Sequence, residues 1–399
     1  MSKVRRTRYA FFYLDDSYLP DLAAILSGNL PAPGPQARIV AHSILTGDRC
    51  DVTRRELEVL LEIPAGSWTE VNTHDRDDVS GLAEKGLLVT DDGGGRRAAL
   101  RQRDEALAAT EWNPYAALYH YMTQWTNVDV REPGEEEFRL TPKVLELSQG
   151  FLAEHGPPPG EFAEERNARS VPLPGAPHDS ALFRTLAARR TTRSFDVEEP
   201  MSLDQLDTVL RYVFGCHGYG TTTAGVVCIK RTSPSGGALH AIEAYPIISN
   251  VTGVQAGIYH YNVRDHALTL ISELEPAEAR NLTTNFMCGQ SYFGAAHVSF
   301  VLTARFYRSH WKYRRHQKAY VGLLMDAAHL SQTLYLVSAE LGLGAFVTIA
   351  INARDIEERV GLDGVNEGVL AMVGCGRRAP GESPLDLHVS PEPAGMTAA

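Results

Sequence analysis

Hydrophobic positions near the start of the chain recur at helical spacing. Residues 37–45 fit one helix, a second helix begins at Thr53, and a third runs from about residue 74 to residue 85. The second helix has a clear start, because Thr53 and Glu56 occupy the two positions of a capping box. Gly86 supplies a stop for the third helix, since glycine favours the left-handed cap conformation.

A hairpin is predicted directly after the third helix. Residues 87–90 have the composition of a strand, residues 91–95 are an Asp/Gly turn, and a return strand begins at Arg96. Three helices followed by a hairpin is the order of a winged helix, so we expect residues 1–110 to form a winged-helix-like domain. Its third helix begins His74-Asp-Arg-Asp-Asp78, whose carboxylates repel phosphates. This favours a peptide-binding or structural role over DNA binding.

The middle of the chain has the composition of a linker. Trp112 to Trp125 is an aromatic-rich stretch with helical character, and we expect it to pack on the domain that follows. From Arg131 the chain becomes acidic and rich in Pro and Gly, which is typical of an extended, solvated segment. Residues 111–179 are therefore predicted to be an aromatic helix and a linker.

Helical and strand patterns alternate after the linker. The predicted elements are helices at 180–190, 202–214 and 318–341, a hairpin at 257–271, and strands at 297–306 and 367–374. The last of these helices is apolar almost all round, which places it in the core or at a subunit interface. The predicted class is α+β, with residues 180–380 as one domain and residues 381–399 as a flexible tail.

The composition is that of a soluble globular protein. Of 399 residues, 44% are apolar and 22% are charged, and this length is comfortable for two domains. The net charge of −11 argues against general nucleic-acid binding. No apolar run reaches the ~20 residues needed to span a bilayer, and the N-terminus turns acidic too soon for a signal peptide. We therefore expect a cytoplasmic protein with neither a nucleic-acid nor a membrane partner.

The cysteines predict no special chemistry. There are five of them, scattered along the chain, and none lies in a C-x-x-C pair. We expect free thiols in a reducing compartment, with no disulfide framework and no metal site.

Two arginine clusters are candidates for binding a phosphate group. The first contains Arg189, Arg190, Thr191 and Arg193, at the expected end of a helix, and the second is Arg377-Arg378, after the last strand. Guanidinium groups and a hydroxyl in one short stretch can bind phosphate in a bidentate manner. The alternative is a solvated basic helix end that is favoured by the helix dipole.

A loop of small residues, Pro234-Ser235-Gly236-Gly237, permits close approach of the backbone to a ligand. The chain has neither the phosphate-binding loop of the nucleoside triphosphatases nor the dinucleotide fingerprint. A mononucleotide such as FMN is therefore a better candidate cofactor than NAD or ATP. The alternative is an ordinary surface loop.

Lys312 and Tyr313 are adjacent in a basic segment. Their neighbours are Arg308, His310, Arg314, Arg315 and His316. A lysine or tyrosine among cations is suited to remove a proton near neutral pH. The alternative, equally open from spacing alone, is a basic-aromatic surface patch that binds an acidic partner.

These pieces together resemble a known family. The segment from Leu182 to Arg378 is similar to the nitroreductase fold, and specifically to its SagB/ThcOx-type branch. The matching pieces are Arg189-Arg-Thr-Thr-Arg-Ser-Phe195, Pro234-Ser-Gly-Gly-Ala-Leu-His240, Gly257-Ile-Tyr-His-Tyr261, Lys312-Tyr313, Leu324-Met-Asp-Ala-Ala-His329 and Leu341-Gly-Leu-Gly344. The sequence departs from this branch where Thr191 replaces the usual serine and Ala328 the usual glycine.

The resemblance implies an FMN-dependent dehydrogenase that oxidises azolines to azoles in a ribosomally made peptide. Lys312-Tyr313 matches the pair implicated in that oxidation. Ser235 and Gly236 are implied to lie on the isoalloxazine ring. The residues implied to hold the FMN phosphate are Arg189, Thr191, Arg193 and one of Arg377 and Arg378.

The resemblance also implies partners. Enzymes of this fold are homodimers with FMN at the interface, the substrate is a modified precursor peptide, and a cyclodehydratase is a candidate partner. Residues 1–110 resemble a precursor-peptide recognition module. The alternatives left open are a flavin-dependent reductase of dehydroamino acids, an NAD(P)H nitroreductase of the same fold, and a non-catalytic scaffold that recruits a precursor peptide.

Overall fold

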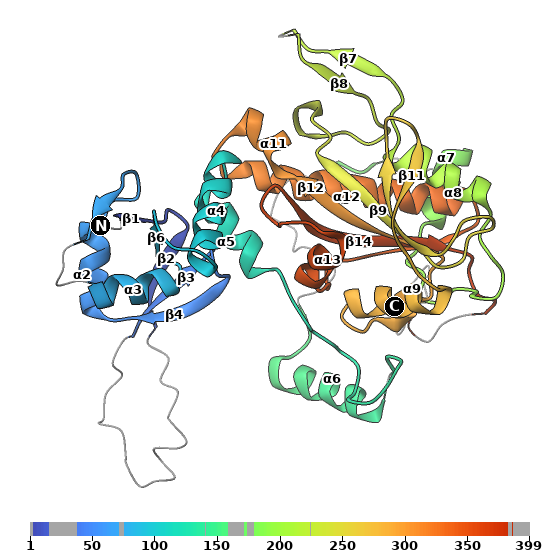
Figure 1. The fold of residues 1–399 in the computed structure, drawn as a ribbon. Helices are drawn as coiled ribbons and strands as arrows, with labels where there is room; N and C mark the ends of the chain where they lie inside the picture. The colour runs from blue at the N-terminus through green and yellow to red at the C-terminus, as the bar shows by residue number, and fades with distance from the viewer. Residues whose placement is uncertain are drawn as a thin grey trace.

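The computed structural model describes residues 3–15, 38–71, 76–139, 141–158, 171–173, 179–223, 225–381 and 385. Figure 1 shows a smaller N-terminal part and a larger part built around one twisted sheet, with α4 (Arg96–Ala109) and α5 (Pro114–Met122) between them. The predicted tail, residues 381–399, lies almost entirely outside the described residues. Within the described ranges, no helix is both long and apolar enough to cross a membrane.

The larger part contains an antiparallel sheet of six strands in the order β11-β10-β9-β12-β14-β13. The strands are β9 (Ile242–Ile248), β10 (Gly257–Asn262), β11 (Ala267–Glu273), β12 (Val298–Arg305), β13 (Gly344–Thr348) and β14 (Glu367–Gly376). An antiparallel sheet with helices on both faces agrees with the mixed α and β content predicted from the sequence.

The central strand β12 shows how the core is divided. Its side chains alternate between the two faces of the sheet. Phe300 and Leu302 join the cluster that contains the buried face of α12 (Lys318–Glu340). Val301 joins the cluster on the opposite face, with α9 (Pro276–Phe286) and α13 (Ala353–Val360). Every position of β12 except Arg305 is buried, which explains its continuous apolar pattern.

The structure confirms the strongest predicted elements of this part. The chain forms α7 (Ala181–Ala188), α8 (Leu203–Val209) with a π-helical turn over Leu210–Phe214, the β10–β11 hairpin and the long helix α12. One face of α12 is buried, as predicted. The side chains of Val321, Leu324 and Met325 on its other face are 51%, 36% and 56% exposed in the single chain.

The N-terminal part agrees with the prediction in its helices. α2 (Arg54–Glu62) begins with the predicted capping box, in which Glu56 N donates to Thr53 Oγ1 at 3.1 Å and Thr53 N donates to Glu56 Oε2 at 2.8 Å. α3 (Arg76–Glu84) is followed by Gly86, whose φ of +67° is the expected left-handed conformation. Residues 72–75, where the third helix was predicted to start, lie outside the described residues.

The strands of this part differ from the prediction. The segment predicted as the first helix is instead β3 (Arg38–Ser43), which pairs with β2 (Ala10–Asp15) and β4 (Asp48–Val52). A second sheet has the order β5-β1-β6, formed by β5 (Thr69–Glu70), β1 (Lys3–Arg6) and β6 (Leu88–Thr90). Short apolar runs fit a helix or a strand equally well, and pairing on both sides makes this one a strand.

The predicted hairpin is wrong. β6 forms as expected, but residues from Arg96 onward form α4 rather than a return strand, so no wing follows α3 in the described part of the chain. The sequence of α4 is rich in Ala, Leu and Arg, which are strong helix formers. The winged-helix architecture is therefore not confirmed.

The aromatic helix packs on the larger part, as predicted. Trp112 is fully buried, and its Nε1 donates to the carbonyl of Val365 at 3.0 Å. Tyr121 OH on α5 donates to the carbonyl of Gly364 at 2.7 Å. These two bonds attach α5 and the residue just before its cap to the loop that precedes β14.

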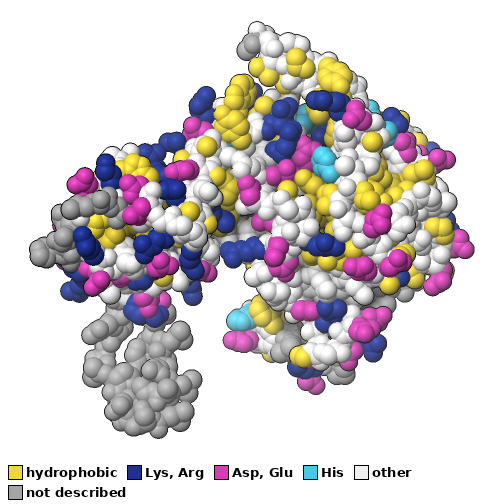
Figure 2. Space-filling view, in the orientation of Figure 1, with side chains coloured by type: hydrophobic (Ala, Val, Ile, Leu, Met, Phe, Trp, Pro, Cys, Tyr) yellow, Lys and Arg dark blue, Asp and Glu magenta, His cyan; other side chains and the backbone are white. Residues whose placement is uncertain are grey.

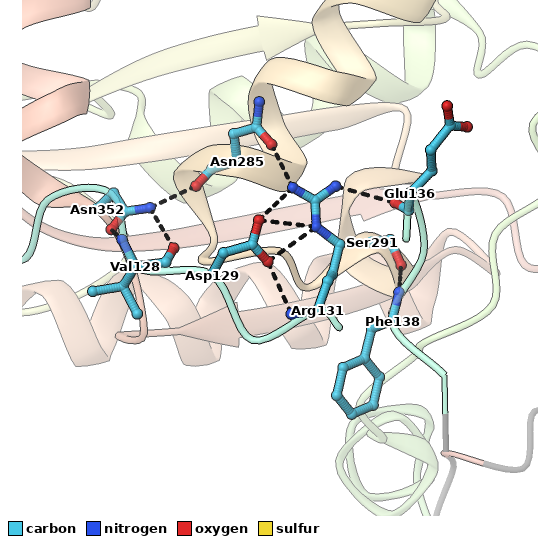
Figure 3. A network of polar contacts seen from close by, with 8 residues as sticks. All are labelled: Val128, Asp129, Arg131, Glu136, Phe138, Asn285, Ser291 and Asn352. Carbon is cyan, nitrogen blue, oxygen red and sulfur yellow. Dashed lines mark hydrogen bonds and ion pairs between the residues drawn. The ribbon is translucent and has the colours of Figure 1, made fainter. Parts of the chain in front are cut away.

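The predicted extended linker is more ordered than expected. Figure 3 shows part of it held against the larger part by a polar network. Val128 N donates to Asn352 Oδ1 at 2.8 Å, and Asn352 Nδ2 donates to the Val128 carbonyl at 2.9 Å. Arg131 Nη2 donates to Asn285 Oδ1 at 3.0 Å. A helix, α6 (Pro142–His155), follows. Residues 159–170 and 174–178 of the predicted linker lie outside the described residues.

Candidate functional site

The first arginine cluster runs along the edge strand β13. Thr191 forms a parallel bridge with Ala345, and Thr192 N donates to the Ala345 carbonyl at 2.9 Å. A Cβ atom added to Gly344 would lie 2.6 Å from Thr192 Cγ2, so only glycine allows this close approach. The Gly344 of the Leu-Gly-Leu-Gly motif thus positions the cluster.

The second arginine cluster lies beside the first, although almost 190 residues separate them in the sequence. Phe195 forms an antiparallel bridge with Arg378, and Asp196 N donates to the Arg377 carbonyl at 3.0 Å. Arg189 stacks over the ring of Tyr335 on α12, with its guanidinium carbon 5.2 Å from the ring centre.

The cluster has the donor set of an anion site. In the described ranges, no carboxylate pairs with Arg189, Arg190 or Arg377, whereas Arg305 elsewhere pairs with Glu243 at 2.8 Å. Thr191 adds a hydroxyl, which shares a 2.9 Å hydrogen bond with the hydroxyl of Tyr335. Guanidinium groups without a carboxylate partner suit a phosphate group, so these residues fit the phosphate end of FMN.

The small-residue loop is held in place by Asp326, a buried carboxylate on α12. Ser235 Oγ donates to Asp326 Oδ2 at 2.5 Å, and Gly236 N donates to Asp326 Oδ1 at 3.0 Å. His240 N in turn donates to Ser235 Oγ at 2.9 Å. The loop is strained, since Ala238 and His240 adopt φ of +59° and +47°. Asp326 belongs to the Leu324–His329 motif, and its only signal in the sequence is a lone carboxylate within an apolar helix.

The structure brings Lys312 and Tyr313 onto this loop. Both end α11 (Phe306–Tyr313). A Cβ atom added to Gly237, whose φ is +65°, would lie 2.7 Å from Lys312 Nζ and 2.8 Å from Tyr313 OH. The glycine therefore leaves the space that the tips of both side chains approach.

The basic segment around this pair is less cationic than the sequence indicated. Burial lowers the pKa of His310, whose Nδ1 lies 3.0 Å from the Thr110 carbonyl, so its ring is neutral at neutral pH. Arg315 pairs with Glu111 at 2.8 Å. Burial, with a further contribution from the charge of Arg231, lowers the pKa of the nearby His240 to about 4. Lys312 is therefore less crowded by other charges than predicted.

The loop and the arginine cluster lie on opposite faces of α12 within one chain. Asp326 contacts Ser235, and Thr333 contacts Ser233 at 2.6 Å. Tyr335, which contacts the arginine cluster, is nine residues beyond Asp326, or half a turn around the helix at about 100° per residue. The structure therefore brings the loop together with Lys312-Tyr313, and it brings the two arginine clusters together. Within a single chain, the loop and the arginine clusters remain on opposite sides of α12.

A cavity of about 530 Å³ is lined by Tyr307, Arg308 and Trp311, which precede the Lys-Tyr pair on α11. It lies between α11 and the hairpin of β7 (Tyr219–Thr221) and β8 (Val227–Ile229). This cavity and its aromatic wall were not predicted from the sequence, because the wall depends on a tertiary contact that no local pattern records. In the described part of the chain, no group of three or more His, Cys, Asp or Glu side chains is placed to hold a metal ion.

Comparison with known proteins identifies the domain. Residues 186–377 match the Nitroreductase family. The trifolitoxin-processing protein TfxB of Rhizobium leguminosarum bv. trifolii is 29% identical over 166 residues, which are 41% of this chain and 41% of that protein. A nitroreductase homologue of Methanocaldococcus jannaschii is 26% identical over 197 residues, which are 49% of this chain and 91% of that protein. Among solved structures, a chain of the E. coli microcin synthetase McbBCD complex is 20% identical with a TM-score of 0.41, covering 60% of this chain and 95% of that one.

The family match defines the class of this domain. Residues 186–377 are a nitroreductase-family domain, and that family consists of flavin-dependent oxidoreductases. The resemblance drawn from short motifs is thus confirmed for this domain. The match spans less than half the length of the trifolitoxin-processing protein.

Proposed function

We propose that the protein is an FMN-dependent dehydrogenase that oxidises azolines to azoles in a ribosomally made precursor peptide. The observation that carries the proposal is the meeting of Lys312 and Tyr313 at Gly237, because it joins a base to the loop expected to lie along the flavin. The similarity to a trifolitoxin-processing protein supports a peptide substrate.

The residues proposed to hold FMN form two groups. Arg189, Arg190, Thr191, Arg193 and one of Arg377 and Arg378 would bind the phosphate, and Pro234 to Gly237 would lie along the ring. Asp326 has a positioning role, since it holds the loop through Ser235 and Gly236.

The chemistry divides between the cofactor and the protein. Conversion of an azoline to an azole removes two hydrogens from the ring, one with its electron pair, which FMN accepts when bound, and one as a proton. The Lys312-Tyr313 pair would take that proton, with Tyr313 as the acceptor and Lys312 assisting it. The azoline itself is a product of cyclodehydration, so a cyclodehydratase is the expected partner upstream.

We further propose that the active unit is a homodimer, in which the arginine cluster of one protomer and the loop of its partner share a flavin. A helix is about 10–12 Å across with its side chains, which keeps the two groups of a single chain apart. The exposed apolar face of α12 supports this arrangement. Light scattering of the FMN-loaded protein should give twice the chain mass; an FMN-saturated monomer would contradict the shared site.

The N-terminal part is proposed to recruit the unmodified portion of the precursor. The predicted wing hairpin is replaced by α4 among the described residues, so the peptide needs another surface. A crevice of about 280 Å³ beside α3 offers another surface, with Val79 and Ala83 as its apolar floor and Arg76 at its rim. Arg76→Glu should raise KM for a full-length precursor and spare a leaderless peptide, whereas Arg54→Glu on α2 should change neither.

The reaction is tested by incubating the purified protein with an azoline peptide and measuring product mass. Loss of two hydrogens supports the proposal. Two other results would replace it: reduction of a dehydroamino acid in a peptide, or flavin reduction by NAD(P)H with no reaction of the azoline. A protein that binds precursor but never holds flavin would be a scaffold.

A further inference from the structure

The cavity along α11 has an aromatic and aliphatic wall. Tyr307 and Trp311 are four residues apart, so they project from the same face of α11. Val227 and Cys228 of β8 and the side chain of Leu239 complete the apolar lining. Tyr307, Trp311 and Val227 remain 48%, 45% and 62% exposed, which leaves their apolar surfaces available to a ligand. Figure 2 shows hydrophobic side chains on both the hairpin and α11, on either side of a group of Lys and Arg.

The cavity is built on the same two elements as the proposed reaction site, α11 and the end of the small-residue loop. Trp311 directly precedes Lys312, and Leu239 follows Gly237 by two residues. Arg308 Nε donates to the Leu239 carbonyl, which fixes α11 against the end of the loop. Because both sites share α11 and this loop, a peptide whose ring lies at Gly237 can extend its flanking residue toward the cavity.

The charges in the cavity wall are mostly satisfied within the protein. Arg305 pairs with Glu243 at 2.8 Å. Glu367 accepts hydrogen bonds from Tyr245 OH at 2.9 Å and Thr303 Oγ1 at 2.5 Å. What remains to face an occupant is chiefly apolar, and the volume of about 530 Å³ is within the range of small-ligand sites.

We propose that this cavity holds an apolar or aromatic side chain of the residue next to the heterocycle, and that Trp311 determines which rings in a precursor are oxidised. This inference rests on the proposed function, since it takes a peptide azoline as the substrate. Trp311 acts here as a specificity residue and has no part in the proton transfer.

The test uses short azoline peptides that differ only in the flanking residue, which is Phe, Ala, Glu or Lys. Wild-type protein should show the highest kcat/KM with Phe. Trp311→Ala should reduce the Phe-to-Ala ratio of kcat/KM by roughly 10- to 200-fold, the range for a lost apolar pocket contact, mainly through a lower kcat/KM for the Phe peptide. Trp311→Phe should keep the preference. Tyr219→Ala, on the same hairpin but outside the lining, should change nothing.

A binding measurement distinguishes a wrong assignment of the cavity from a wrong assignment of the reaction. Kd is measured by calorimetry for the corresponding azole peptides, which cannot react further. A Phe preference in Kd that Trp311→Ala abolishes supports the cavity even where no azoline is oxidised. Equal kcat/KM and Kd for Phe and Ala, an unchanged ratio in Trp311→Ala, or a preference for Glu would overturn it.

Discussion

Replacing Gly237 with alanine should damage catalysis far more than stability. The residue has a φ of +65°, and its new Cβ would lie 2.7 Å from Lys312 Nζ and 2.8 Å from Tyr313 OH. Both side-chain tips must move back by about 0.6–0.7 Å to reach the ordinary contact distance of 3.4 Å. Since a misplacement of about 1 Å can cost ~100-fold in rate, we expect kcat to fall roughly 10- to 100-fold.

The stability cost of this substitution can be separated from its catalytic cost. An L-residue in the left-handed region costs about 1–2 kcal/mol, which lowers Tm by about 2–8 °C for a domain of this size. Gly253 has a similar φ of +75° and nothing within 4 Å of an added Cβ, so Gly253→Ala is a matched control. It should lower Tm to a similar extent and leave kcat unchanged. A wild-type kcat in Gly237→Ala would refute the placement of the pair at the loop.

Three further predictions follow from the site and its surroundings. Tyr313→Phe and Lys312→Ala should still bind FMN and form the dimer, but their turnover should fall by ~10²–10⁴, the usual contribution of a general base. Flavin reduction at the wild-type rate in both variants would show that the pair is a surface patch without a catalytic role. Arg193→Ala should lose a charge-assisted phosphate contact worth roughly 1.5–3 kcal/mol, measured as weaker binding of FMN. An unchanged Kd for FMN would show that Arg193 does not bind the phosphate. Burial raises the pKa of Glu357 from 4.5 to about 7, so the folded state keeps a proton that the unfolded state releases and stability falls as pH rises from 4.5 to 7. Chemical denaturation of Glu357→Gln should show a flatter pH dependence over that interval, and an unchanged slope would contradict this.

The parts of the fold that could be predicted are those with strong local signals. The capping box at Thr53 identified α2, and the continuous apolar pattern of α12 and the alternation in β10–β11 identified those elements. The helix predicted at residues 37–45 failed, because a short apolar run takes its conformation from its strand partners. The hairpin predicted from the Asp/Gly turn at residues 91–95 failed, because the Ala-, Leu- and Arg-rich segment after that turn forms a helix rather than a return strand.

The candidate site divides in the same way. Glycines and adjacent ionisable side chains are visible in a sequence, so the Gly237 loop and Lys312-Tyr313 could be proposed before the structure. The role of Asp326 and the stacking of Arg189 on Tyr335 depend on how α12 packs, and no local pattern encodes them. The same is true of the cavity at Trp311, whose opposite wall lies about 85 residues earlier in the sequence.

The central claim is that the loop at Gly237 and the Lys312-Tyr313 pair form the reacting centre of a flavin dehydrogenase. The most direct test is to mix the purified, FMN-loaded protein anaerobically with one equivalent of an azoline peptide and follow the absorbance of oxidised flavin. We expect the absorbance of oxidised flavin to fall as an equal amount of azole forms, and to fall much more slowly in Tyr313→Phe. A protein that cannot be loaded with FMN, or an oxidised flavin that persists while the peptide is bound, would contradict it.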